Sequence, residues 1–173
     1  MIKKIMMTCV VLGIIAIVCP VNAEKKFSYS LHGVTFETRV EFSSPAEAGT
    51  DALAMVYPKD SPPGEEKMSI TAVLYTRDTQ KLMGMSDPGL LNYTKSVFMG
   101  TAASGKTIER AFAGMSVKGE MLEKKIPSPS MIEVFIVTLL KGGKIGFCFK
   151  YTKEIRIEEA QKIIAEIGAT LKE

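Results

Sequence analysis

The sequence predicts an α+β domain in which an antiparallel β-sheet carries helices packed on its faces, an α/β/α sandwich. Two observations predict this class. Segments that alternate apolar and polar residues follow one another as hairpin pairs, and a segment with a helical apolar stripe follows the last pair. A sheet with apolar faces must be covered, and amphipathic helices are the usual cover.

Residues 1–23 have the pattern of a cleaved export signal. Lysines open the segment, an apolar run covers 10–18, and the small residue Ala23 precedes a cluster of charge. This run is shorter than the roughly 20 apolar residues that cross a hydrocarbon core, and no later run is longer, so we expect no transmembrane segment. The bulky Val18 disfavours lipid attachment at Cys19. We therefore expect cleavage after Ala23 and a periplasmic or secreted protein.

Residues 24–173 are predicted to form a single α+β domain. Cleavage leaves 173 − 23 = 150 residues, the length of one domain with one core. Two lysines leave with the signal, so the formal charge falls from +3 to +1. This balance argues against a nucleic-acid partner, which requires a clustered basic surface. Cys148 is then the one cysteine left, so burial of apolar groups must hold the domain together without a disulfide.

The first predicted element is a hairpin over 27–42. A two-residue turn at His32-Gly33 would pair Leu31 with Val34. This register puts the alternating apolar side chains of both strands on one face.

Three further strands and a helix follow. Strands are predicted over 53–57, 68–76 and 117–126 from their alternation and from the prolines and glycines that bound them. Between the last two, Asp87 as N-cap and Gly100 as terminator bound a predicted helix. Its apolar or inward positions are Leu90, Leu91, Thr94, Val97 and Phe98.

The late hairpin, 131–140 with 145–151, is the clearest element in the chain. Gly142-Gly143 can form a type I′ turn, because glycine readily adopts the positive φ angles that this turn needs. That turn pairs Leu140 with Ile145, Thr138 with Phe147, Ile136 with Phe149, and Val134 with Tyr151. The hairpin is apolar on both faces, so we expect both faces to be covered.

A closing amphipathic helix is predicted to supply one cover. Its stripe consists of Ala160, Ile163, Ile164, Ile167 and Leu171. These positions recur at helical spacing, with charged residues between them.

This order of elements resembles the PsbP-like superfamily, which includes the extrinsic oxygen-evolving subunit of photosystem II and exported bacterial relatives. The similar parts are the opening FSYSLHGVTFE, the late hairpin MIEVFIVTLLKGGKIGFCFKY and the closing helix IEEAQKIIAEIGATLK. The resemblance implies an antiparallel sheet crossed by the C-terminal helix. It also implies a non-enzymatic binding or assembly factor attached to a larger complex.

One stretch, 100–107, matches the P-loop pattern G-x-x-x-x-G-K-[ST], with Lys106 and Thr107 as its phosphate and magnesium residues. A P-loop follows a buried strand, whereas a helix is predicted before Gly100. No apolar run ending in Asp is available to bind the metal. We interpret the match as a coincidence in a flexible loop.

His32 and Cys148 are candidates for a nucleophilic pair, because a histidine can activate a thiol. Cys148 lies between two phenylalanines in a predicted strand, where cysteine usually acts as a small buried hydrophobe. His32 lies in a predicted turn, and no third residue is in place to orient it. The sequence thus predicts no catalytic residues.

The Met83-Gly84-Met85 element could offer two thioethers to Cu(I), although core or loop packing is the more ordinary role of methionine. Acidic residues at Asp60, Glu65 and Glu66 lack the spacing of a calcium loop, and we interpret them as a solvated edge. The sequence therefore predicts no metal and no cofactor.

These observations favour an exported, non-enzymatic domain that binds a protein partner or supports an assembly in the bacterial envelope. The alternative is a small-ligand or metal-binding periplasmic protein, and an enzyme ranks third. An exposed apolar patch with a polar rim would favour the first function. A convergent polar pocket would favour the others.

Overall fold

The computed structural model describes residues 25–47, 51–100, 104–125 and 129–173. The predicted export signal, 1–23, lies outside the described residues. Nine strands, three α-helices and one π-helix are assigned within them. In chain order they are β1 (Phe27–Leu31), β2 (Val34–Thr38), β3 (Ala46–Glu47), β4 (Ala52–Tyr57), β5 (Met68–Tyr75), α1 (Arg77–Met83), α2 (Asp87–Thr94), η1 (Lys95–Met99), β6 (Lys106–Phe112), β7 (Met115–Lys124), β8 (Ser130–Thr138), β9 (Lys144–Thr152) and α3 (Ile157–Thr170).

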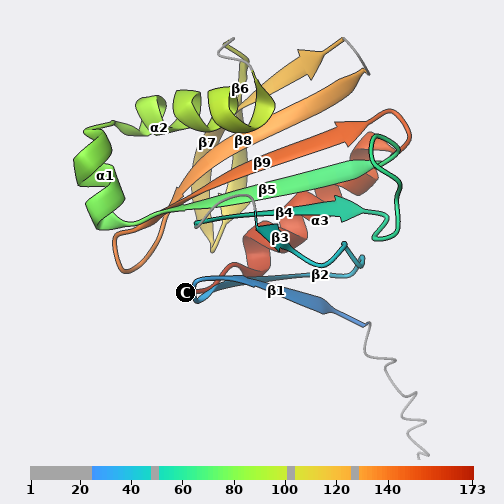
Figure 1. Ribbon diagram of the computed structural model, residues 1–173, viewed down its shortest axis with the longest axis horizontal. Helices are drawn as coiled ribbons and strands as arrows, with labels where there is room; N and C mark the ends of the chain where they lie inside the picture. Colours follow the sequence, from blue (N-terminus) through green and yellow to red (C-terminus); the bar gives the residue numbers. More distant parts are fainter. Residues whose placement is uncertain (1–24, 48–50, 101–103, 126–128) are drawn as a thin grey trace, which may run out of the picture.

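The strands form one seven-stranded sheet and a separate hairpin. The sheet order is β3-β4-β5-β9-β8-β7-β6, and every neighbouring pair is antiparallel. On one face of this sheet lie α3 and the β1–β2 hairpin, and on the other lie α2 and η1 (Figure 1). The predicted α+β class, with helices on the faces of an antiparallel sheet, is confirmed.

The β1–β2 hairpin has the predicted register, with Leu31 opposite Val34. His32 and Gly33 both have positive φ angles, 47° and 87°, as a type I′ turn requires. The second strand is shorter than expected, because β2 ends at Thr38. Beyond it, the backbone N–H of Phe42 donates a hydrogen bond of 2.7 Å to the Tyr29 hydroxyl, so Phe42 still packs beneath the hairpin.

The predicted register of the late hairpin is wrong by three residues. Ile145 lies opposite Val137 rather than Leu140, and Phe147 lies opposite Phe135. The loop contains three residues, 140–142, and only Gly142 has a positive φ angle (83°), whereas a type I′ turn needs two such residues. An odd shift moves side chains to the other face of the sheet.

This shift changes which side chains share a face. The residues predicted to lie on one face were Val134, Ile136, Leu140, Ile145, Phe147 and Phe149. The last three face α3, whereas Val134 and Ile136 face the α2 side, and Leu140 lies in the loop. Both faces are nevertheless covered, as their apolar character predicts.

The closing helix packs as its sequence pattern predicts. All five stripe residues are buried against the sheet and the hairpin. Gly168 brings α3 close to the sheet edge, because a Cβ atom there would lie 2.1 Å from the carbonyl oxygen of Ala111. The helix thus rests directly on the backbone of β6.

The predicted middle helix has a different N-cap from the one expected, and its last turn is π-helical. Ser86, not Asp87, is the N-cap of α2, and Gly100 ends η1 in the left-handed conformation as predicted. The N–H of Gly100 bonds to the carbonyl of Lys95, five residues earlier, which marks a π-helical turn. Because this turn is wider than an α-helical one, Val97 falls outside the apolar stripe and its side chain is 52% exposed.

Three elements are not predicted by the sequence: β6, α1 and the two-residue strand β3. β6 begins at Lys106, inside the stretch interpreted as a loop. α1 is capped by the Thr76 hydroxyl, which accepts the Thr79 N–H at 3.1 Å, and by Gly84. None of its residues is buried, so it has no apolar stripe that a sequence pattern could reveal.

Candidate functional site

The structure does not bring the candidate nucleophilic pair together. Cys148 is buried on the α2 side of the sheet, among Leu122, Ile132 and Val134. This burial raises the pKa of its thiol to about 12, so the reactive thiolate is strongly disfavoured. His32 lies in the turn of the hairpin that covers the opposite face, with its Nε2 3.6 Å from Asp51.

The P-loop match does not have the geometry of a phosphate site in its described part. Gly100 ends a helix, and Lys106 and Thr107 are exposed at the start of strand β6. In a P-loop these two residues begin a helix, whose N-terminal amides hold the phosphates. Residues 101–103 lie outside the described residues.

The methionine and acidic candidates are dispersed. Met83 packs against the core cluster beneath α2, whereas Met85 is exposed beyond it. Asp60 and Glu65 are exposed, and a carboxylate oxygen of Glu66 accepts the N–H of Gly64 at 2.7 Å. Within the described ranges, no group of three His, Cys, Asp or Glu side chains could hold a metal ion.

A buried polar network that the sequence does not reveal lies on the α3 side of the sheet. Glu133 in β8 is fully buried, and its Oε1 accepts bonds of 3.0 Å from Arg110 Nη2 and from the Tyr151 hydroxyl. Burial and the neighbouring Glu133 carboxylate raise the pKa of Tyr151. The arginine compensates the buried charge, so the network serves to fix β6 and β9 around β8. Glu133 Oε2 and Arg110 Nε have no hydrogen-bond partner among the described residues.

A second buried ion pair joins η1 to β7. Lys95 Nζ, whose side chain is fully buried, lies 2.6 Å from Glu120 Oε2, which also accepts the Gly105 N–H at 2.9 Å. Burial opposes ionisation of Glu120, but these two donors outweigh it and lower the pKa of its carboxyl. The pair stabilises the attachment of η1 to the sheet.

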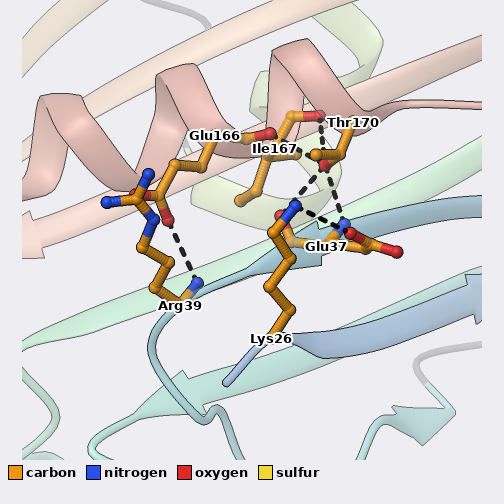
Figure 2. Close-up of polar contacts among 6 residues, drawn as sticks. All are labelled: Lys26, Glu37, Arg39, Glu166, Ile167 and Thr170. Carbon is orange, nitrogen blue, oxygen red and sulfur yellow. Dashed lines mark hydrogen bonds and ion pairs between the residues drawn. The ribbon is translucent and has the colours of Figure 1, made fainter. Parts of the chain in front are cut away.

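A polar seam joins the N-terminal hairpin to α3 and borders a shallow pocket of about 220 Å³. Figure 2 shows Arg39 and Lys26 reaching toward Glu166 and Glu37 along this seam. The Arg39 backbone N–H donates to Glu166 Oε2 at 3.1 Å, and the N–H of Glu37 donates to the Thr170 hydroxyl at 2.8 Å. Lys26 and Glu37 lie 3.5 Å apart as an ion pair. These groups bind one another, so the seam stabilises the packing of the hairpin against the helix.

A mainly apolar hollow lies at one end of the sheet. We call this end the loop end, because the β6–β7 turn, the β8–β9 loop and residues 171–173 meet there, with α1 beside them (Figure 1). The hollow has a volume of about 290 Å³. It is lined by Ala113, Met115, Val137, Thr138, Leu139, Leu140, Leu171, Lys172 and Glu173. Leu140 is 93% exposed and Met115 is 44% exposed.

The β8–β9 loop is held in the shape that projects Leu140. The N–H of Leu139 donates to the carbonyl of Gly143 at 2.9 Å, and the N–H of Gly142 donates back to the carbonyl of Leu139 at 3.0 Å. The N–H of Lys141 donates to a carboxylate oxygen of Glu173 at 2.8 Å, which ties the loop to the C-terminal residues. Leu139 therefore turns inward while Leu140 projects into solvent.

The sequence does not predict this hollow. The predicted register pairs Leu140 with Ile145 inside the sheet, where it would be buried. A three-residue loop that ends at Gly142 is equally compatible with Gly142-Gly143, and in that loop Leu140 is exposed. No sequence pattern distinguishes the two loops.

Comparison with known proteins identifies no family for this chain. No family model matches the chain, and no curated protein matches it. The structure is similar to a crystal structure of a protein from Bacteroides thetaiotaomicron VPI-5482, with a TM-score of 0.47 and 14% sequence identity. The match covers 86% of this chain and 47% of that one, so this chain spans about half the length of that protein.

The described residues contain no helix that is both long and apolar enough to span a membrane.

Proposed function

We propose that this protein is an exported, non-enzymatic binding or assembly-accessory domain that docks on a protein partner through the loop end of its sheet. The observation that carries the proposal is the hollow with Leu140 and Met115 at its edge. Leu140 is 93% exposed at the tip of its loop, so its apolar side chain is in contact with water. Binding of a partner would bury it.

The surroundings of the hollow support a docking role. Polar and charged groups, Thr138, Lys172 and Glu173, stand beside the apolar lining, so the hollow has the apolar centre and polar rim of an interface. By contrast, the polar seam at α3 and the two buried ion pairs bind groups of the same chain. The PsbP-like pattern of the sequence is in keeping with this proposal, since members of that superfamily mostly act as accessory factors.

A photo-crosslinking experiment tests the proposal. A photoreactive amino acid is placed at Leu140 of the full chain in the producing cells, and the matched control carries it at Ile157. Ile157 is 44% exposed, as Met115 is, but lies at the start of α3, at the opposite end of the sheet. We expect a defined protein adduct from Leu140 and none from Ile157.

The partner identified from the adduct is then purified, and its affinity for the protein is measured. Met115→Ser should weaken binding of the purified partner about tenfold or more, because the interface loses part of a buried side chain. Ile157→Ser should leave the affinity unchanged. Equal adducts from both positions, or an unchanged affinity in Met115→Ser, would contradict the assignment of the docking surface.

A further inference from the structure

The charges around the hollow indicate what kind of partner it fits. We infer that the partner presents an acidic amphipathic segment, in which apolar side chains enter the hollow and carboxylates beside them meet the cations of the loop end. This inference rests on the proposed docking function and specifies its partner. The cations are Arg77, Lys81, Lys141 and Lys172.

The four cations belong to one continuous surface. Lys172 lines the hollow, and Lys141 lies at the tip of the loop that borders it. The same loop touches α1, because Gln80 Nε2 lies 3.5 Å from the carbonyl oxygen of Gly142. A Cβ atom on Gly142 would lie only 2.3 Å from the guanidinium of Arg77, so that side chain rests on the loop. The surface therefore runs from the hollow across the loop to α1, where Lys81 lies four residues after Arg77 and so on the same side of the helix.

Cations outnumber acids on this surface. None of the four takes part in an ion pair within the part of the chain that the structure describes, whereas the neighbouring Lys144 is paired with Asp87. The unpaired acids here are Asp78 of α1 and Glu173, whose carboxylate is engaged by a backbone N–H. A partner segment with carboxylates would pair these cations and complement the surface.

The neighbouring helix α1 also exposes a leucine. Leu82 of α1 is 89% exposed and directly follows Lys81, just as Leu140 directly precedes Lys141. Each exposed leucine thus has a cation next to it. This composition of exposed leucines and cations fits a segment that carries both apolar and acidic residues.

The shape of the surface favours a protein segment over a lipid surface. The hollow of about 290 Å³ receives side chains that project from the partner. A bilayer presents no projection of fixed shape, although its anionic headgroups would also attract lysines.

Selection from a random peptide display library tests the inference. The mature protein, residues 24–173, is the bait, and peptides that also bind the Met115→Ser/Leu140→Ser variant are removed. We expect the remaining peptides to be enriched in Glu and Asp next to Leu, Ile, Phe or Met. Their affinity for Lys81→Glu/Lys141→Glu should fall about tenfold and should weaken as salt is added.

Lys124→Glu is the matched control, because Lys124 is an exposed lysine at the far end of β7. It should leave peptide affinity unchanged within about twofold. The remaining peptides are those that need Met115 and Leu140 for binding. If they show no charge preference, or an excess of Lys and Arg, this inference is wrong but the docking function is not contradicted. Binding of the mature protein to phosphatidylglycerol vesicles that Leu140→Ser abolishes would also overturn it. A selection that yields no hollow-dependent peptide would contradict the docking function itself.

Discussion

Leu139 and Leu140 are identical side chains in adjacent positions, yet one is buried and the other is 93% exposed. The difference comes from two backbone hydrogen bonds between Leu139 and residues 142–143, which close a three-residue loop directly after Leu139. Burying a leucine stabilises a protein by roughly 1.5–3 kcal/mol relative to leaving it in water. Leu140 contributes none of this in the isolated chain, which is why we assign it to a partner.

Two charged side chains show the opposite behaviour: they are buried, although removing a charge from water costs free energy. Lys95 and Glu133 are both fully buried, and each is paired with an opposite charge. Such a pair adds little net stability, but loss of one partner strands a charge in the interior. Each pair therefore constrains which elements can meet: η1 with β7, and β6 with β8.

Glu120→Gln should reduce stability in a pH-dependent way. Burial opposes ionisation, but Lys95 and the Gly105 N–H outweigh it, so the pKa of Glu120 lies below its ordinary value of 4.5. A carboxyl with a lowered folded-state pKa adds stability above its unfolded pKa and loses it as the pH falls through the folded pKa. The free energy of unfolding should thus be about 2 kcal/mol lower in the variant at pH 7, and this difference should shrink below pH 4.5.

Chemical denaturation between pH 7 and pH 3 measures this difference. Glu123→Gln is the control, because Glu123 is exposed on the same strand and makes no ion pair among the described residues. A Glu120→Gln difference that stays constant with pH would show that the charge of Glu120 has no role in the pair.

At the level of elements, the position of α3 depends on the absence of one side chain. Gly168 lets the helix touch β6, and its carbonyl accepts the N–H of Ala113 at 2.7 Å. The other side of the helix is held by the polar seam to β2. The helix therefore connects the N-terminal hairpin to the edge of the large sheet.

Gly168→Ala should destabilise the protein by about 1–3 kcal/mol, since the new Cβ would meet the Ala111 carbonyl oxygen at 2.1 Å and push α3 away from β6. Helix propensity alone predicts the opposite, a gain of about 1 kcal/mol. Ala165→Gly, at an exposed position of the same helix, reports propensity alone and should cost about 1 kcal/mol. Thermal or urea unfolding of the two variants measures both effects. A more stable Gly168→Ala protein would mean that α3 does not rest on β6.

For the whole molecule, both faces of the central strands are covered and the loop end remains open. β5, β9 and β8 lie in the middle of the sheet, between α3 with the N-terminal hairpin on one side and α2 with η1 on the other (Figure 1). With its faces covered in this way, the sheet leaves Leu140 and Met115 exposed at one end of its strands, whereas the helices expose Tyr93 and Val97. The proposed docking surface lies at this end of the strands.

The mature protein is predicted to begin at Glu24. A small residue, Ala23, ends the signal pattern, and charged residues follow at once. The intact mass of the protein recovered from outside the cytoplasm measures this directly. A chain that retains residues 1–23, or a lipid-modified chain that starts at Cys19, would show that the prediction is wrong.

The sequence by itself determined the fold class, the N-terminal hairpin register and the buried stripe of α3. Each depends on a periodicity that is visible within a short stretch of sequence. Tyr29 and Leu31 alternate with a period of two, and Ile163, Ile164 and Ile167 recur at helical spacing. Cys148 was likewise interpreted correctly as a buried hydrophobe, because its neighbours in the strand are phenylalanines.

Only the tertiary structure decided the register of the late hairpin, the existence of β3, β6 and α1, and the candidate site. Two loops of different length fit the same pair of glycines, and in the observed register the rings of Phe135 and Phe147 both pack against Phe149. The ion partners of Lys95 and Glu133 come from strands that lie 23 or more residues away in the sequence, so no local pattern predicts these pairs. The hollow is formed by three segments that meet at one end of the sheet, and it exists only once they are folded together.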